Sequence, residues 1–279
     1  MVNFNGKIVS LDAGLMFQNR AFLYGDAVFE TVKIINAKIL FLEDHYFRLM
    51  SSMRVVRMEI PMNFTMEYFE EQILDLAKAK NLENSSRVRI TVYRNEGGYY
   101  LPNENSVSFS INAELIENSF YSINENEYKV DLYTDFYVTR QLLSSIKTTN
   151  KILNVTASIF ANENGLDNCL LLNDSKNVVE ALQGNIFMLK GNILSTPPVS
   201  EGCLNGVMRK QLLVLAKQIE NLVVVEEIIS PFDLQKADEL FITNVIKGIQ
   251  PITKYRKKEF STDLAKVLIE KLNQFISNN

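Results

Sequence analysis

Patterns typical of strands alternate with patterns typical of helices along this 279-residue chain, and no other feature restricts its fold as much. Residues 87–93 alternate apolar and polar side chains, which is the two-residue period of a strand. Residues 65–80 instead carry an apolar side chain at every third or fourth position, the period of an amphipathic helix. Because both patterns recur in both halves of the chain, the sequence predicts a mixed α/β or α+β fold.

The remaining segments with a clear pattern belong to the same two kinds. Asn5-Gly6 between two short apolar runs is the strongest local signal for a hairpin. Helices are expected to begin near residue 43 and after residue 147, and to cover 65–80, 206–218 and 262–276. Strands are expected at residues 2–4, 7–9, 27–34, 38–42, 87–93, 106–111, 129–133, 169–172, 178–181, 185–189, 222–225 and 240–243.

A polar stretch rich in Asn, Ser and Glu runs from residue 117 to residue 128. Such a composition is typical of a connection, and a chain of this length suits two domains. We therefore expect a small N-terminal domain over residues 1–116, a linker over 117–128 and a larger domain over 129–279.

Composition and charge exclude several classes of function. The net charge is −4 with both signs interspersed, so no basic stripe indicates a nucleic acid partner. No apolar run approaches membrane-spanning length and no signal peptide is recognisable. Cys169 and Cys203 form no redox or metal motif, and His45 is the sole histidine, so a His-rich metal site is impossible. These features predict a cytoplasmic protein with reduced thiols, no metal, and no nucleic acid or membrane partner.

Short signatures in a fixed order carry most of the functional information. They lie at residues 24–31 (Tyr-Gly-Asp-Ala-Val-Phe-Glu-Thr), 45–49, 146–150 (Ile-Lys-Thr-Thr-Asn), 180–181, 185–187, 196–198, 206–209 and 238–244. Together they resemble the fold-type IV pyridoxal-phosphate enzymes, which include branched-chain aminotransferases, D-amino-acid aminotransferases and 4-amino-4-deoxychorismate lyases. The resemblance implies a two-domain α/β fold like that of D-amino-acid aminotransferase. It further implies a small N-terminal α/β sandwich, a larger C-terminal domain with a pseudo-barrel sheet, pyridoxal 5′-phosphate as cofactor, and a homodimer.

Lys147 matches the lysine that carries the cofactor in this family. An unprotonated lysine amine forms a Schiff base with the aldehyde of pyridoxal phosphate, and an apolar setting favours the unprotonated form. The preceding Leu142-Leu143 and Ile146 can supply such a setting. By resemblance, Lys147 holds the cofactor and then acts as the general acid and base.

Other positions match the groups that hold the cofactor. Glu180 matches the carboxylate that faces the pyridine nitrogen, and Arg48 matches a guanidinium that binds the phosphate. Residues 206–208 open a predicted helix whose free amides form an anion site. The expected cofactor ligands are therefore Arg48, Lys147, Glu180, Val207, Met208, Thr243 and Asn244.

Thr31 matches a hydroxyl that is important in the lyase branch. It follows Glu30 on a predicted strand, so the two side chains should point to opposite faces and one of them into the cleft. A β-branched residue chosen for strand propensity explains Thr31 equally well. His45 is as readily explained as a structural histidine, and no role is assigned to it.

The branch of the family is set by the substrate pocket. The chain lacks the Tyr-x-Arg-Pro pattern of branched-chain enzymes and the Arg-x-His pattern of D-amino-acid enzymes, whereas Gly97-Gly98, residues 205–209 and residues 242–244 look closer to the lyases. Ala27 replaces the usual second glycine of the first signature. We predict an aminodeoxychorismate lyase, which forms 4-aminobenzoate and pyruvate for folate synthesis. The alternatives are an aminotransferase acting on a branched-chain or D-amino acid, and an inactive homologue that only binds the cofactor.

The dicarboxylate substrate of such a lyase would require cationic partners. Arg89 and Arg94 are candidates, and strand parity puts them on different faces. The sequence does not choose between them.

Overall fold

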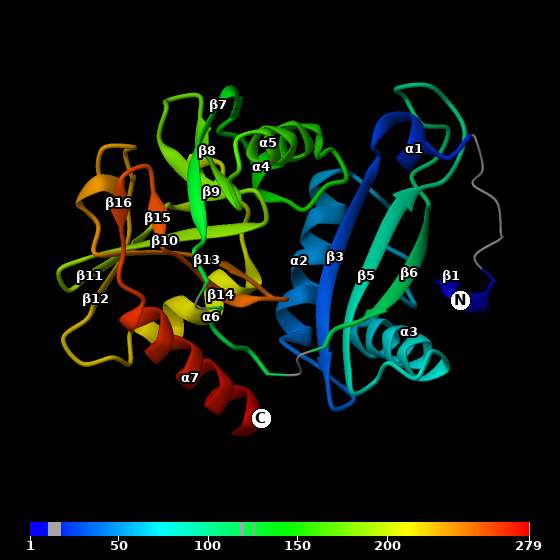
Figure 1. The fold of residues 1–279 in the computed structure, drawn as a ribbon. Helices are drawn as coiled ribbons and strands as arrows, with labels where there is room; N and C mark the ends of the chain where they lie inside the picture. Colours follow the sequence, from blue (N-terminus) through cyan, green and yellow to red (C-terminus); the bar gives the residue numbers. More distant parts are fainter. Residues whose placement is uncertain (11–17, 118–119, 125, 279) are drawn as a thin grey trace. The chain divides into compact units, whose positions relative to one another are not determined.

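The computed structural model describes residues 1–10, 18–117, 120–124 and 126–278, and its chain forms two compact units (Figure 1). The first unit comprises Met1–Phe120 and Ile146–Asn150, and the second comprises Tyr121–Ser145 and Lys151–Asn279. The predicted division with a linker over 117–128 remains a prediction. What the sequence did not indicate is that residues 146–150, the segment of Lys147, belong to the first unit.

The first unit is a six-stranded antiparallel sheet covered on one face by helices α2 and α3. Its strand order is β2-β1-β6-β5-β3-β4. Side chains from β3, β5 and β6 alternate, and every second one enters a core shared with both helices. The elements are β1 (Val2–Phe4), β2 (Lys7–Val9), α1 (Arg20–Tyr24), β3 (Ala27–Ile35), β4 (Lys38–Ile39), α2 (Leu42–Val55), α3 (Met66–Ala79), β5 (Ser85–Arg94) and β6 (Val107–Leu115).

The second unit is built on a larger, mixed sheet in the order β12-β11-β10-β9-β8-β7-β15-β16, with β13 pairing both β10 and β14. Its strands are β7 (Lys129–Val138), β8 (Asn168–Asn173), β9 (Val178–Ala181), β10 (Gly184–Lys190), β11 (Ile193–Thr196), β12 (Val223–Glu226), β13 (Glu239–Asn244), β14 (Gly248–Ile252), β15 (Lys254–Tyr255) and β16 (Lys258–Glu259). Its helices are α4 (Leu142–Ser145), α5 (Ile152–Glu163), η1 (Val199–Glu201), α6 (Val207–Ala216), η2 (Leu234–Lys236) and α7 (Asp263–Asn278).

The mixed α/β class predicted from the alternating patterns is confirmed, and each predicted helix and strand has a counterpart. The strand expected at 38–42 was too long, because β4 ends at Ile39 and α2 already begins at Leu42. The short elements α1, β11, β14, β15 and β16 were not predicted, since few residues leave no measurable period.

Helix α5 shows where a pattern and its burial differ. Its apolar residues at helical spacing, Ile152, Val155 and Ile159, are at least half exposed, while Ala157 and Ala161 face the core of the second unit. None of the helices in the described part of the chain has the length and apolar character that crossing a membrane requires. Both cysteines are free and buried.

Candidate functional site

The segment that carries Lys147 is held against the edge of the first unit's sheet by backbone hydrogen bonds. Phe29 N donates to Lys147 O at 2.8 Å, and Thr149 N donates to Ala27 O at 3.1 Å. Val28 and Thr148 form an antiparallel bridge between these two bonds. The lysine is thus attached to β3, although the chain on both sides of residues 146–150 belongs to the second unit.

The side chain of Lys147 lies over an aromatic ring together with a second cation. Its Nζ is 4.5 Å from the centroid of the Phe29 ring, and the guanidinium carbon of Arg89 is 3.7 Å from the same centroid. Phe29 and Thr31 lie on one face of β3 by alternation, and Arg89 is paired with Thr31 on the neighbouring strand β5. Lys147, Phe29, Arg89 and Thr31 therefore belong to the face of the sheet opposite the helices.

Glu30 points to the other face of β3, where its carboxylate contacts Arg48 and His45 of helix α2. Arg48 Nε donates to Glu30 Oε1 and Arg48 Nη2 to Glu30 Oε2, each at 2.7 Å. His45 Nδ1 lies 2.8 Å from Glu30 Oε2. Glu30 and His45 are completely buried, so these three residues form a charge cluster inside the first unit.

The protonation states in this cluster follow from its geometry. Burial alone raises the pKa of Glu30, but Arg48 and His45 outweigh burial and lower that pKa to about 2. Burial lowers the pKa of His45, and the charges of Arg48 and Lys147 add to this against the opposing effect of Glu30. Glu30 is therefore ionised and can only accept, so His45 Nδ1 carries the proton. His45 Nε2 is left as a buried acceptor without a hydrogen-bond partner among the described residues.

The structure separates the two arginines that the sequence left open. Arg94 is buried on the helix-covered face, where it donates to Asp26 Oδ2 at 3.0 Å, Arg57 O at 3.1 Å and Val56 O at 2.7 Å, and also to Asn105. Its guanidinium nitrogens thus all donate to other groups of the first unit. Arg89 is half-buried, donates to Thr91 Oγ1 at 3.3 Å, and has no carboxylate partner in the described part of the chain. Only Arg89 keeps donors for a ligand.

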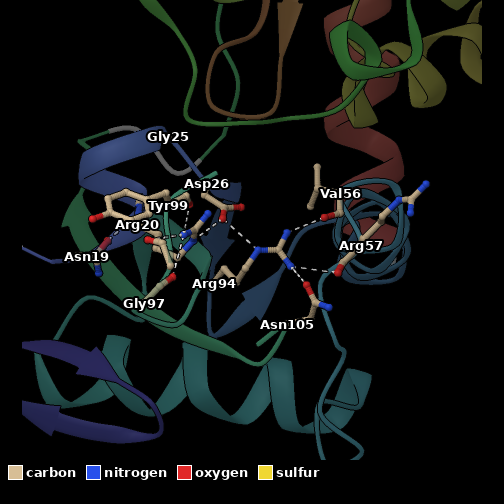
Figure 2. A network of polar contacts seen from close by, with 12 residues as sticks. Asn19, Arg20, Gly25, Asp26, Val56, Arg57, Arg94, Gly97, Tyr99 and Asn105 are labelled. Atoms are coloured by element: carbon tan, nitrogen blue, oxygen red, sulfur yellow. Dashed lines mark hydrogen bonds and ion pairs between the residues drawn. The ribbon is translucent and has the colours of Figure 1, made fainter. Parts of the chain in front are cut away.

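Asp26 of the first signature has a structural role rather than a place beside the lysine. Figure 2 shows its carboxylate between Arg20 and Arg94, whose Nε atoms donate to Asp26 Oδ2 at 2.9 and 3.0 Å. Arg20 Nη1 also donates to Gly97 O at 2.9 Å and Tyr99 O at 2.7 Å. This network attaches the loop after β5 to helix α1.

The second unit carries the predicted carboxylate on strand β9. Glu180 is half-buried, and its Oε2 accepts a hydrogen bond from Leu204 N at 2.9 Å. It lies opposite Asn185 on β10 and Leu171 on β8. The residues that precede Glu180 on this strand are apolar, and Val178 and Val179 are fully buried.

Helix α6 begins with amides that no side chain caps. Gly206 is its N-cap residue and offers no side-chain acceptor, so the amides of Val207 and Met208 have no cap partner. A Cβ at Gly206 would lie 2.0 Å from Asn185 Oδ1, which explains why glycine stands at this position. Asn185 is itself fixed by donating Nδ2 to Leu204 O at 2.8 Å.

Thr243 supplies the clearest indication of a ligand in the second unit. Its Oγ1 is buried and has no hydrogen-bond partner among the described residues. The side chain of Asn244 is differently used, since its Oδ1 accepts from Ile246 N at 3.0 Å and Lys247 N at 2.9 Å. Any contact of Asn244 with a ligand is therefore expected through its backbone.

These groups fit the cofactor that the sequence predicts. A buried hydroxyl without a partner costs about 1–3 kcal/mol, and a phosphate oxygen that accepted from Thr243 would remove this cost. The free amides of α6 suit the same anion. Lys147 and Arg48 belong to the first unit, whereas Glu180, Val207, Met208, Thr243 and Asn244 belong to the second. No group of three or more potential metal ligands occurs in the described ranges.

The sequence missed the cluster partners of Arg48 and the ring under Lys147. Glu30, His45 and Phe29 stand in the signatures, yet their contacts join residues from 15 to 118 positions apart. Strand alternation could have placed Phe29 on the face of Thr31. Nothing local connects Glu30 with His45.

Comparison with known proteins gives the same answer over almost the whole chain. A family model described as amino-transferase class IV matches residues 27–255. A putative branched-chain-amino-acid aminotransferase of Methanocaldococcus jannaschii is 32% identical over 89% of this chain and 85% of its own length. A D-alanine aminotransferase of Bacillus licheniformis is 25% identical over 90% of this chain and 87% of its own.

Solved structures share the fold at lower identity. The branched-chain amino acid aminotransferase of Thermobaculum terrenum, solved in its pyridoxal-phosphate form, superposes with a TM-score of 0.83 at 22% identity, over 99% of this chain and 92% of its own. A putative 4-amino-4-deoxychorismate lyase of Legionella pneumophila also gives 0.83, at 24% identity, over 95% of this chain and 96% of its own.

Proposed function

Since this chain belongs to the class IV aminotransferase family and is a pyridoxal-phosphate enzyme, we propose that it transfers the amino group of a small aliphatic amino acid to a keto acid. The observation that carries this choice is the 32% identity to a putative branched-chain-amino-acid aminotransferase over most of both chains. The chemistry of the first unit supports it, because an apolar ring and a cation lie beside Lys147.

Lys147 is the proposed catalytic residue. Bound pyridoxal phosphate supplies an electron sink for the negative charge that develops on the substrate carbon. Lys147 Nζ holds the cofactor at rest, removes the proton from that carbon, and returns it to another position. Its fixed backbone, bonded to Phe29 N, limits where the amine can reach.

The cofactor's charged ends are assigned to side chains of both units. We assign the phosphate to Arg48, the first amides of α6, Thr243 Oγ1 and the backbone of Asn244. Arg48 donates from Nε and Nη2 to Glu30. This pair of hydrogen bonds fixes the plane of the guanidinium for the phosphate. Glu180 would keep the ring nitrogen protonated, which strengthens electron withdrawal.

Arg89 is the proposed partner of the substrate carboxylate. It shares the Phe29 ring with Lys147, so an amino acid could place its amine toward Lys147 and its carboxylate toward Arg89. Burial lowers the pKa of Arg89, with the charge of Arg87 adding to the effect, yet a guanidinium remains charged at neutral pH.

A second candidate is the aminodeoxychorismate lyase that the signatures predict. The observation that favours it is Thr31, whose position opposite Arg89 puts its hydroxyl on the face that carries Phe29 and Lys147. A lyase would use Lys147 for the first proton transfer in the same way, and the enolpyruvyl group of the substrate would then leave.

Product analysis separates the two candidates. The purified holoprotein is mixed with L-leucine, L-valine or D-alanine together with 2-oxoglutarate, and separately with 4-amino-4-deoxychorismate. Amino-group transfer predicts the keto acid of one amino acid in equal amount to the glutamate formed. Pyruvate and 4-aminobenzoate in a one-to-one ratio, without any keto acid from the amino acids, would replace the aminotransferase by the lyase. The Lys147→Ala variant is the blank for both reactions.

We also propose that the active protein is a homodimer. Tyr99, Tyr100 and Leu101 at the tip of the loop after β5 are 84%, 91% and 84% exposed, although Arg20 fixes the backbone of this loop. A fixed loop that presents large apolar side chains to water is typical of a protein interface. Analytical ultracentrifugation at working concentration should give twice the chain mass, and an active monomer would contradict the proposal.

A further inference from the structure

The position of Lys147 depends on a contact at the far end of its own segment. Asn150 Nδ2 donates to Gly25 O at 3.1 Å, and Thr149 Oγ1 donates to the same oxygen at 3.1 Å. Gly25 ends helix α1 and immediately precedes Asp26 and strand β3 (Figure 2). The segment of Lys147 makes two backbone hydrogen bonds with β3, and the side chain of Asn150 adds a further hydrogen bond at the end of the segment.

Gly25 is required at this contact for two separate reasons. Its φ of 63° lies in the left-handed region, where its N–H closes helix α1 on Ala21 O at 3.1 Å. A Cβ at Gly25 would also lie 2.2 Å from Asn150 Oδ1, far inside contact distance. Residue 25 must therefore lack a side chain both for its own backbone and for Asn150 to lie against it.

We propose that Gly25 and Asn150 form a latch that positions Lys147 on strand β3. The chain enters the first unit at Ile146 and leaves it after Asn150, so the short segment 146–150 holds the lysine to this unit. Two of the hydrogen bonds that hold them end on Gly25 O. Both latch residues are positioning residues, because they act on Lys147 through the backbone of its segment.

The latch joins two signatures whose contacting residues, Gly25 and Asn150, are 125 positions apart. If Asn150 is removed, the segment keeps its bonds to Phe29 and Ala27 but loses its anchor next to Lys151, where the chain departs. Lys147 would then sample positions away from the Phe29 ring, and its amine would meet water more often. The significance for catalysis rests on the proposed role of Lys147, whereas the position of the amine does not.

The test measures Lys147 in the cofactor-free protein. An amine-reactive reagent is applied briefly, and modification of the Lys147 peptide is followed by mass spectrometry in the wild type, Asn150→Ala, Gly25→Ala and the double variant. Gly165→Ala is the matched control, because Gly165 also has a left-handed φ of 61° and a Cβ there would meet nothing within 4 Å. Circular dichroism verifies folding, and Asn150→Ala, at an exposed side chain, carries the test if Gly25→Ala does not fold.

The latch predicts that Asn150→Ala and Gly25→Ala each accelerate modification of Lys147 by up to about tenfold, the factor that one hydrogen bond supports. The double variant should match Gly25→Ala instead of multiplying the two effects, because a Cβ at residue 25 already displaces Asn150 from the contact. Gly165→Ala should leave the rate unchanged. Unchanged modification in Asn150→Ala, or multiplied effects in the double variant, would overturn the latch.

A second measurement connects the latch with cofactor capture. The rate at which added pyridoxal phosphate becomes fixed to the protein by borohydride should fall about tenfold to a hundredfold in Asn150→Ala, as expected when a reacting group is misplaced by about 1 Å. Cofactor fixed to another lysine in the wild type would refute the proposed function and leave the modification test of the latch valid.

Discussion

The proposed cofactor-binding groups of the two units differ in how far they are paired within the protein. In the first unit, Arg48 is already paired with Glu30, and His45 completes a buried cluster whose charges balance within the protein. In the second unit, Thr243 Oγ1 has no hydrogen-bond partner among the described residues, and no side chain caps the first amides of α6. A pre-paired cation is held rigidly and its loss should weaken the fold, whereas unused donors should affect only binding.

The largest effect is expected at Lys147, because the second unit has no proposed group with the same role. Lys147→Ala should abolish turnover and every covalent attachment of pyridoxal phosphate, because the only proposed anchor is gone. Turnover assays and borohydride reduction followed by peptide mapping measure this. Lys151→Ala, four residues further on, is the control that should retain the cofactor, and cofactor still fixed in Lys147→Ala would show that another lysine carries it.

Breaking the paired half should cost stability. Glu30→Gln removes the buried carboxylate that accepts from Arg48 and His45 and should lower the free energy of unfolding by about 3–5 kcal/mol, since Arg48 loses its ion pair with Glu30. Urea denaturation of the cofactor-free protein measures it. Glu114→Gln breaks the exposed pair with Arg87 at 3.3 Å and should cost only about 0–1 kcal/mol. Equal losses in the two variants would remove the distinction between the buried cluster and a surface ion pair.

The same variant predicts a dependence on pH. The pKa of Glu30 is depressed from 4.5 to about 2 in the folded chain, so its contribution is present above pH 4.5 and is lost as the pH falls toward 2. This shift corresponds to about 3 kcal/mol. The difference in unfolding free energy between wild type and Glu30→Gln should therefore shrink over this window. A difference that stays constant would mean that Glu30 is not held ionised.

An intermediate effect is expected at Arg89, which has no carboxylate partner in the described part of the chain. Arg89→Gln should raise the KM for the amino acid by tens of fold, because a charge-assisted hydrogen bond contributes about 1.5–3 kcal/mol. The unfolding free energy should change little, in contrast to Glu30→Gln. Steady-state kinetics and denaturation on the same preparation give both values. An unchanged KM would show that Arg89 does not bind the substrate carboxylate.

The smallest effect is expected at Thr243 of the second unit, whose hydroxyl has no partner among the described residues. Thr243→Val should weaken pyridoxal-phosphate binding by about tenfold and leave the stability of the cofactor-free protein unchanged or slightly raised, since it removes an unsatisfied hydroxyl. Thr196→Val is the matched control, because Thr196 Oγ1 already donates to Ile186 O at 2.7 Å. That variant should lose stability and keep its cofactor affinity. The reverse pattern would exclude Thr243 as a phosphate ligand.

The sequence by itself determined the longer helices and strands, the family and the cofactor. Periodicity is a local property, so the positions of α2, α3, α6 and β5 followed from nearby residues. The order of the signatures likewise needed no coordinates. Strand alternation already separated Arg89 from Arg94, since successive side chains of a strand point to opposite faces and these two are an odd number of residues apart.

Only the tertiary structure decided what these residues contact. It buried Arg94 among Asp26 and backbone carbonyls and left Arg89 beside the ring of Phe29. It paired Arg48 with Glu30, and it brought Asn150 onto Gly25, 125 positions away in the chain. Such contacts depend on where distant segments meet, and chain periodicity carries no information about that meeting. The chemistry of the site could therefore be recognised from the sequence, whereas the contacts that hold it in place could not.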